Sequence, residues 1–299
     1  MTESLAITGA TGFIGSAVAR AASSEPVRLL VREGQSNFDA RLIVGDLRDR
    51  ITLRELVEGV HTVVHCASYV GHDQELANEV NDVGTRSLVA ASLAAGVQRI
   101  IYVSTTGVYG TGPFSDADET TPRDPVSVTS RSRARAEDRI LDAGGLVIRP
   151  HLVVGVGDRR VLPLLPSLVQ AAQGVPAPAA RASVIDVDEL ARQVWSLAAS
   201  PHTSRAFNAQ HGAAISLRDL YDEMVLHGLI ASAPDISADA ALTRLREMGI
   251  GEHQAQMLSN DATFTSSLPA ASKSPSVPLS AASLGWYEST ILTERRVKL

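Results

Sequence analysis

Residues 7–15 read Ile7-Thr8-Gly9-Ala10-Thr11-Gly12-Phe13-Ile14-Gly15, with three glycines spaced three apart. A short apolar run precedes it and a helix-like run follows it, so the sequence predicts a strand, a glycine turn and a helix. In that context Gly9 permits a tight turn, Gly12 lets a pyrophosphate approach the backbone, and Gly15 lets the helix close onto the strand. The first N–H groups of the helix favour phosphate, so the stretch predicts a dinucleotide-binding site.

Composition narrows the class of protein. The chain has 299 residues, 44% of them hydrophobic, enough for a sizeable core in one large or two interleaved domains. The formal net charge of −6 gives no reason to expect nucleic acid as a partner. The single cysteine, Cys66, excludes an internal disulfide and most metal-ligand clusters, and its apolar run favours a packing role. No signal peptide precedes the first strand and no apolar run reaches membrane-spanning length, so we expect a cytoplasmic protein without a metal or a membrane partner.

The second apolar run, Val27–Val31, ends at Arg32. An acidic residue at this place would accept hydrogen bonds from the adenine-ribose diol, whereas a guanidinium suits a 2′-phosphate. The sequence therefore favours NADP (NADPH) as the coenzyme. NAD stays open, because Arg32 beside Glu33 also fits a solvated surface arginine.

The glycine spacing is GxxGxxG, and Thr8–Gly15 resembles the extended branch of the short-chain dehydrogenases/reductases, which includes nucleotide-sugar epimerases and dehydratases. Further segments follow the order of that family: Gly45-Asp46-Leu47, Asn81–Thr85, Arg99–Gly110, Leu146–Gly155, Ser183–Ala191, Ala206–Ala209 and Leu284-Gly285-Trp286. The resemblance implies an α/β fold with a Rossmann doubly wound parallel sheet in residues 1–155. It also implies a smaller, mostly helical region over the substrate in residues 156–299, with residues 183–208 returning to the core.

The resemblance also assigns coenzyme contacts. Asp46 of the Gly-Asp-Leu segment would meet the adenine amino group, and two small residues after the fourth strand would let the chain pass close to the coenzyme. Asn81 would fix the helix and the active-site backbone, and backbone groups near Pro150 and Val153 would hold the carboxamide. The predicted coenzyme-binding residues are Gly9, Thr11, Gly12, Phe13, Ile14, Gly15, Arg32, Asp46, Leu47, Ala67, Ser68, Asn81, Pro150 and Val153.

The catalytic positions depart from the family pattern. In the family, a hydroxyl residue four positions before the second tyrosine of YVSSxxVYG polarises the substrate carbonyl, and here that position is Thr105. A Tyr-x-x-x-Lys pair should follow at the start of a helix. The flanking residues place Thr129 at the tyrosine position and Arg133 at the lysine position. A threonine hydroxyl is far too weak an acid for the proton transfer, and arginine cannot join a proton relay.

Three functions fit this pattern. The first is an atypical NADPH-dependent ketoreductase in which the substrate, a quinone-like aromatic polyketide such as an angucyclinone of antibiotic biosynthesis, stabilises its own product oxygen. The second is a non-catalytic NADP-binding redox sensor, like members of the superfamily that also lack the tyrosine. The third is a nucleotide-sugar epimerase or dehydratase, which needs the missing tyrosine as a base. We favour the first, because Thr105 and the nicotinamide-side segments are intact, and we expect a small aromatic substrate and a monomer or homodimer.

Two segments of the second region carry expectations of their own. Val161–Val169 is apolar and punctuated by proline, so it fits either the wall of a pocket for a flat apolar ligand or the core of the covering region. Ala262–Ala282 is rich in Ser, Pro and Ala with little charge, and is expected to form a mobile loop.

Overall fold

The computed structural model describes residues 5–22, 26–32, 38–201, 203–209, 213–250, 255, 258–268 and 279–297. The chain divides into two compact units. The coenzyme unit comprises Met1–Gly110, Thr121–Pro150 and Asp188–Ala209, and the second unit comprises Thr111–Thr120, His151–Val187 and Gln210–Leu299.

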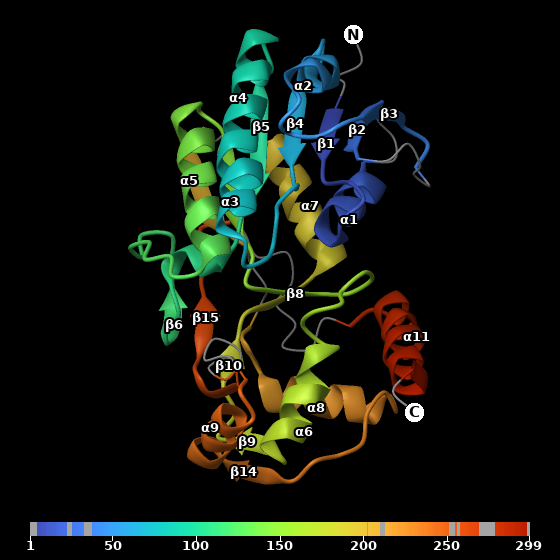
Figure 1. Cartoon of the computed structure of the whole chain (residues 1–299), viewed down its shortest axis with the longest axis vertical. Helices are drawn as coiled ribbons and strands as arrows, with labels where there is room; N and C mark the ends of the chain where they lie inside the picture. The colour runs from blue at the N-terminus through green and yellow to red at the C-terminus, as the bar shows by residue number, and fades with distance from the viewer. Residues whose placement is uncertain are drawn as a thin grey trace. The chain divides into compact units, whose positions relative to one another are not determined.

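A seven-stranded sheet forms the centre of the coenzyme unit (Figure 1). Its strands are β1 (Leu5–Thr8), β2 (Val27–Val31), β3 (Arg41–Val44), β4 (Thr62–His65), β5 (Arg99–Val103), β7 (Leu146–Arg149) and β12 (Arg205–Asn208). The order is β12-β7-β5-β4-β1-β2-β3, and every neighbouring pair is parallel. Strands β1, β4 and β7 are buried along their whole length, as their Val- and Ile-rich sequences require of a sheet covered on both faces. The predicted Rossmann-like α/β fold is confirmed.

Helices complete the layers of this unit. They are α1 (Phe13–Ala21), α2 (Arg50–Val57), α3 (Gln74–Ala77), the π-helix η1 (Asn78–Gly84), α4 (Thr85–Ala94), the 3₁₀-helix η2 (Thr106–Tyr109), α5 (Val128–Asp142) and α7 (Val187–Ala198). Apolar side chains of α2, α4 and α5 pack on one face of the sheet in a single buried cluster. On α1 and α7, the indole N–H of Trp195 donates to the carbonyl of Val18 at 3.1 Å. A regular helix was expected around Asn81, and the structure instead has a π-turn there.

The second unit contains small sheets and helices. Its strands are β6 (Phe114–Ala117), β8 (Leu152–Val154), β9 (Val175–Ala177), β10 (Arg181–Ala182), β11 (Val184–Asp186), β13 (Ile215–Ser216), β14 (Asp235–Ser237) and β15 (Ala262–Phe264). Its helices are α6 (Leu164–Ala172), α8 (Leu217–Leu226), α9 (Ala238–Glu247) and α11 (Ala281–Val297). The strands pair as β13-β10-β15-β6, β11-β8 and β14-β9.

The structure tests the two expectations for this unit, which concern the apolar segment 161–169 and the loop at 262–282. Leu162, Leu165 and Leu168 are at most 2% exposed within a cluster that also takes in α8 and α9, so the segment 161–169 forms core. The mobile loop expected at 262–282 is wrong at both ends, because 262–264 pairs as β15 and α11 begins at Ala281. β15 forms because its backbone pairs with β6 and β10, partners that local composition cannot reveal. Residues 269–278 lie outside the described residues.

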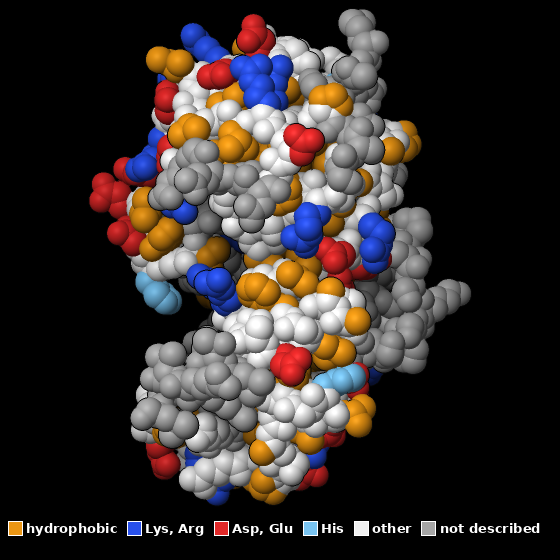
Figure 2. Space-filling model, turned by 90° about the vertical axis from the view of Figure 1, so that its right-hand side faces the viewer, with side chains coloured by type: hydrophobic (Ala, Val, Ile, Leu, Met, Phe, Trp, Pro, Cys, Tyr) orange, Lys and Arg blue, Asp and Glu red, His pale blue; other side chains and the backbone are white. Residues whose placement is uncertain are grey.

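The described surface mixes both signs of charge. Figure 2 shows acidic and basic side chains interspersed with apolar ones on the face it presents. Within the described part of the chain, no helix has the length and the apolar character to cross a membrane.

Candidate functional site

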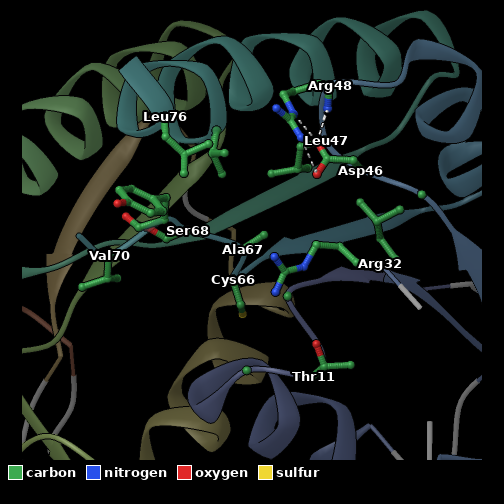
Figure 3. Close-up of a pocket in the computed structure, with 16 residues that line it drawn as sticks. Thr11, Arg32, Asp46, Leu47, Arg48, Cys66, Ala67, Ser68, Val70 and Leu76 are labelled. Carbon is green, nitrogen blue, oxygen red and sulfur yellow. Dashed lines mark hydrogen bonds and ion pairs between the residues drawn. The ribbon is translucent and has the colours of Figure 1, made fainter. Parts of the chain in front are cut away.

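A cavity of about 390 Å³ lies in the coenzyme unit at the carboxyl ends of β1, β2, β3 and β4 (Figure 3). In the sheet, β1 lies between β4 and β2, which is the point where the strand order reverses. Ligands of open parallel sheets bind in the crevice at this point. The cavity is lined by Gly9, Thr11, Gly12, Leu30, Arg32, Gly45, Asp46, Leu47, Arg48, Cys66, Ala67, Ser68, Tyr69, Val70, Leu76 and Val80.

The glycine turn after β1 forms one wall of this cavity. Gly9 has a φ of +74°, and a Cβ on it would lie 2.6 Å from the backbone nitrogen of Ala67. A Cβ on Gly15 would lie 2.1 Å from the carbonyl oxygen of Gly9, so α1 can pack on the turn only if this position is glycine. Gly12 is the N-cap of α1. Because glycine has no side chain, it makes no capping hydrogen bond to the first backbone N–H groups of the helix. These N–H groups and the dipole of the helix suit a pyrophosphate, so the residues present fit a dinucleotide.

Charged side chains gather at the ends of β2 and β3. Arg32 and Asp46, two of the predicted coenzyme-binding residues, both line the cavity. Arg48 lines it as well, and its Nε donates to Asp46 at 2.8 Å. The hydrogen bond from the Arg48 side chain holds the pKa of Asp46 below its usual value against partial burial, and the nearby charge of Arg32 acts in the same direction. Asp46 is therefore ionised at neutral pH.

The backbone at Tyr69, which follows β4, is held in place by Asn81 of the π-helix η1. The Asn81 side chain accepts from the backbone N–H of Tyr69 at 2.7 Å, donates to the carbonyl of Tyr69 at 3.0 Å, and donates to the hydroxyl of Ser132 on α5 at 2.9 Å. Asn81 is 1% exposed and does not line the cavity. Its geometry matches a role in fixing the backbone that lines the cavity, and π-turns occur frequently at functional sites.

Thr129 and Arg133 both bind backbone carbonyls of the coenzyme unit. The Thr129 hydroxyl donates to the carbonyl of Gly71 at 3.1 Å. Arg133 donates from Nη2 to the carbonyl of Val103 at 2.6 Å, and its guanidinium carbon lies 5.8 Å from the centre of the Tyr102 ring. Its Nε is buried and has no hydrogen-bond partner among the described residues. Both side chains are thus engaged with backbone carbonyls.

Thr105 caps the short helix η2, and its Oγ1 accepts from the backbone N–H of Gly107 at 3.1 Å. This bond leaves the hydroxyl hydrogen available to a carbonyl oxygen. The side chain is half-buried. A role for Thr105 in polarising a substrate carbonyl remains a prediction that this geometry permits.

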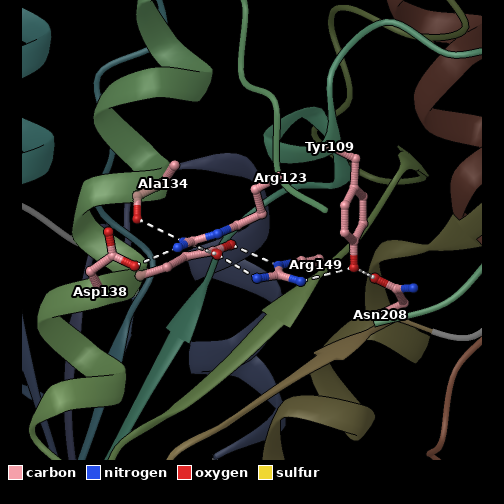
Figure 4. A network of polar contacts seen from close by, with 7 residues as sticks. Tyr109, Arg123, Ala134, Asp138, Arg149 and Asn208 are labelled. Atoms are coloured by element: carbon pink, nitrogen blue, oxygen red, sulfur yellow. Dashed lines mark hydrogen bonds and ion pairs between the residues drawn. The ribbon is translucent and has the colours of Figure 1, made fainter. Parts of the chain in front are cut away.

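With no tyrosine at position 129, Tyr109 is one of the side chains that could donate a proton to a substrate, and it belongs to a polar network (Figure 4). Its hydroxyl donates to Asn208 Oδ1 at 2.8 Å and accepts from Arg149 Nη1 at 2.8 Å. Arg149 in turn forms two bonds with Glu137, from Nε to Oε1 at 2.9 Å and from Nη2 to Oε2 at 2.6 Å. Glu137 is fully buried. Because the four residues come from α5, β7, η2 and β12, the network links these elements. This hydroxyl already has a carbonyl-type acceptor within the protein, which does not suit a proton donor to substrate.

His65 and Cys66 lie at the end of β4. His65 is fully buried, with Nδ1 2.6 Å from the Thr8 hydroxyl and Nε2 2.9 Å from the Thr85 hydroxyl. Burial, with the charge of Arg133 adding to it, lowers its pKa to about 3, so the ring is neutral and structural. Cys66 lines the cavity, and burial raises the pKa of its thiol to about 12, which keeps it protonated.

The structure brings eight of the predicted coenzyme residues into the cavity wall: Gly9, Thr11, Gly12, Arg32, Asp46, Leu47, Ala67 and Ser68. Phe13, Ile14, Gly15, Asn81, Pro150 and Val153 are not in its lining. Pro150 belongs to the coenzyme unit and Val153 to the second unit, so their joint hold on a carboxamide stays a prediction. Sequence reasoning missed the other eight lining residues. Six of them lie within two positions of a predicted residue along the chain, and two stand four apart on neighbouring helical turns. The first six are Leu30, Gly45, Arg48, Cys66, Tyr69 and Val70, and the other two are Leu76 and Val80.

Sheet order, switch-point cavity and glycine turn together define a Rossmann dinucleotide-binding protein. The chain belongs to the NAD dependent epimerase/dehydratase family, whose model matches residues 5–209.

Individual proteins show how far the likeness extends. Sterol demethylase protein B of Methylococcus capsulatus is 38% identical over 183 residues, which cover 54% of this chain and 54% of that protein. The 4-hydroxy-2-methyl-3-oxo-4-farnesyl-3,4-dihydroquinoline-1-oxide ketoreductase of Stigmatella aurantiaca is 32% identical over 180 residues, 53% of each chain. The chain thus spans about half the length of these curated relatives. A dTDP-glucose 4,6-dehydratase double mutant from Streptomyces venezuelae, DesIV, was solved with NAD and DAU bound. It is 20% identical, with a TM-score of 0.71 over 95% of this chain and 96% of that one, which shows the fold alone.

Proposed function

We propose that the protein is an NADPH-dependent ketoreductase that reduces a carbonyl of an aromatic polyketide without the usual tyrosine and lysine. The observation that carries the proposal is the engagement of Thr129 and Arg133 with backbone carbonyls, at the two positions where the family has its proton relay. NADPH would supply the hydride. Thr105 would orient the carbonyl oxygen, a hydroxyl beside that carbonyl in the substrate would pass its proton to the product oxygen, and the resulting phenolate would take a proton from water.

The substrate class follows from this need. A carbonyl beside a phenolic hydroxyl has an internal hydrogen bond that stabilises the developing alkoxide, as in quinone-like angucyclinones of antibiotic biosynthesis. The defective motif resembles the angucyclinone ketoreductase of simocyclinone biosynthesis, an extended-family member without the catalytic pair. The Stigmatella ketoreductase gives a partial parallel, because its name places a 3-oxo group next to a 4-hydroxy group on a dihydroquinoline. That hydroxyl is on the saturated carbon that also carries the farnesyl group, so it is an alcohol and not a phenol. We propose a small aromatic molecule as the substrate of a monomer or homodimer.

NADPH is proposed as the coenzyme because Arg32 lines the cavity at the end of β2. A guanidinium there suits a 2′-phosphate, and charge-assisted bonds to phosphate are strong. Arg32→Asp should weaken NADPH binding by about 1–3 kcal/mol and spare NADH. Titrating both coenzymes against the variant tests this assignment, and equal losses for both would contradict it.

The reaction is tested by following NADPH oxidation with quinone-like aromatic ketones that carry a hydroxyl beside the carbonyl. A general acid contributes about 10²–10⁴-fold in rate, so Thr129→Val should keep turnover within roughly tenfold of the wild type. The rival donors behave alike under this proposal, and Tyr69→Phe, Tyr109→Phe and His151→Gln should each retain turnover to a similar extent. Methylation of the substrate hydroxyl should abolish reduction and leave coenzyme binding intact.

The alternatives give different results in the same assays. Tight NADPH binding without turnover of any such ketone would favour the redox sensor. Turnover of a nucleotide sugar would favour the epimerase or dehydratase, although a threonine hydroxyl makes a poor base for that reaction. If one of the side-chain changes abolishes activity while the methylated ketone is still reduced, the proton comes from the protein and the mechanism is wrong.

A further inference from the structure

We propose that Arg48 sets the coenzyme preference of the cavity by neutralising Asp46, so that a wall carrying a carboxylate accepts the additional phosphate of NADPH. Arg48 would be a specificity-determining residue that acts through another side chain. The inference rests on the proposed use of NADPH. It adds Arg48 to the glycine turn and Arg32 as a determinant of coenzyme binding.

The geometry places Arg48 over Asp46 at the rim of the cavity (Figure 3). Asp46 Oδ1 accepts from the Arg48 backbone N–H at 3.0 Å and from its Nε at 2.8 Å, and Oδ2 lies 3.4 Å from Nη2. The guanidinium also donates from Nη1 to Glu79 Oε2 at 3.1 Å. Arg48 thereby links the loop after β3 to the helix η1 and is held against Asp46 by several bonds.

The charges in this wall make the pairing consequential. Arg32, Asp46 and Arg48 line the same cavity and together carry one net positive charge. Glu79, which is outside the lining, also pairs with Arg48 and makes the whole group of four neutral. Asp46 is ionised at neutral pH, since the Arg48 hydrogen bonds favour its charged form. A phosphate monoester brings between one and two negative charges, about 1.5–2 at neutral pH. A bare carboxylate next to Arg32 would cancel the cation that receives this phosphate, and Arg48 prevents that cancellation.

Arg48 could otherwise be one more surface ion pair. Its side chain is 50% exposed, and pairs of that kind contribute about 0–1 kcal/mol to stability. Loss of an ordinary surface ion pair would change the affinities for NADPH and NADH little and to the same extent. A role through Asp46 predicts instead an effect on the ratio of the two affinities, because the 2′-phosphate is the only charge by which NADPH and NADH differ.

The test is a double-mutant cycle on the whole chain. Dissociation constants for NADPH and for NADH are measured in the wild type, Arg48→Gln, Asp46→Asn and the double variant, at one fixed salt concentration. Arg48→Gln should lower the preference for NADPH about tenfold, as expected when a carboxylate near a dianion loses its counter-charge. Asp46→Asn should leave or raise that preference. The double variant should return to within about threefold of the wild type, because the two changes couple.

Arg54→Gln is the matched control. Arg54 is an exposed arginine of α2 that does not line the coenzyme cavity, and its removal changes the net charge by the same amount. It should leave the ratio unchanged. An equal fall of the ratio in Arg54→Gln would mean that general charge is responsible, and the proposal would be wrong.

Two further outcomes would overturn the proposal. A loss in Arg48→Gln that is the same for NADPH and NADH would make Arg48 a support of the loop only. A loss of preference that Asp46→Asn does not reverse would mean that Arg48 binds the phosphate itself. These outcomes are separate from failure of the proposed function, which would appear as Arg32→Asp weakening both coenzymes equally or as absence of ketone reduction by the wild type. Circular dichroism of each variant keeps a folding defect from imitating any of these results.

Discussion

Glu137→Gln should strongly destabilise the coenzyme unit. Glu137 is fully buried, and its two oxygens accept Arg149 Nε at 2.9 Å, Arg149 Nη2 at 2.6 Å and Arg123 Nη1 at 3.1 Å. Burial opposes charge on Arg149, but the bonds and the charge of Glu137 outweigh it and raise the pKa of the guanidinium. Glutamine keeps the shape but removes the counter-charge and turns one acceptor into a donor that faces guanidinium N–H groups. Leaving one charge of a buried pair without its partner costs about 3–5 kcal/mol.

The measurement is the free energy of unfolding from urea titration, followed by fluorescence and by circular dichroism so that separate transitions are recognised. Asp138→Asn is the matched control, because Asp138 pairs with the same Arg123 at 2.6 Å but is 48% exposed. Its loss should be about 0–1 kcal/mol. In Glu137→Gln/Arg149→Met no charge of the pair remains buried, so much of the loss should be recovered. A loss below about 1 kcal/mol in Glu137→Gln, or no recovery in the double variant, would refute the reasoning.

Three further changes test other parts of the structure. The pKa of His65 is near 6.5 in the unfolded chain and about 3 in the folded protein. Between pH 6.5 and pH 3 the imidazole is therefore protonated only in the unfolded chain, and the free energy of unfolding falls as pH drops through this window. Between pH 6.5 and 5 this group alone should account for about 1.6 kcal/mol, and His65→Gln should flatten that part of the urea-derived pH profile, whereas an unchanged slope would contradict the assignment. Gly15→Ala should weaken or abolish coenzyme binding in titrations, because its Cβ would lie 2.1 Å from the Gly9 carbonyl; wild-type affinity would show that the turn adapts. Tyr287→Phe should cost about 1.5–3 kcal/mol in the second unit, because its buried hydroxyl donates to Asp158 at 2.9 Å, and an unchanged urea midpoint would contradict this role.

Local sequence determined the elements that bind phosphate. The glycine stretch could be predicted from sequence because each glycine is needed for a local backbone geometry, such as the φ of +74° at Gly9. The strands of the large sheet were recognisable because parallel strands buried on both faces are continuously apolar. Counting back from Tyr109 located Thr105, and the flanking residues located Thr129 and Arg133, which predicted that the usual acid and its lysine are absent.

Only the tertiary structure decided what those residues do instead. Thr129 reaches the carbonyl of Gly71, which is 58 positions earlier, and Arg133 reaches the carbonyl of Val103, which is 30 positions earlier. The bond between Arg48 and Asp46 is local, but its place in the cavity wall depends on β3 lying next to β2 and on Glu79 of η1. A sequence pattern reports residue type and spacing along one segment. Hydrogen-bond partners and shared electrostatic surroundings depend on segments that meet only when the sheet has formed, and for that reason the chemistry of this site was set by the fold.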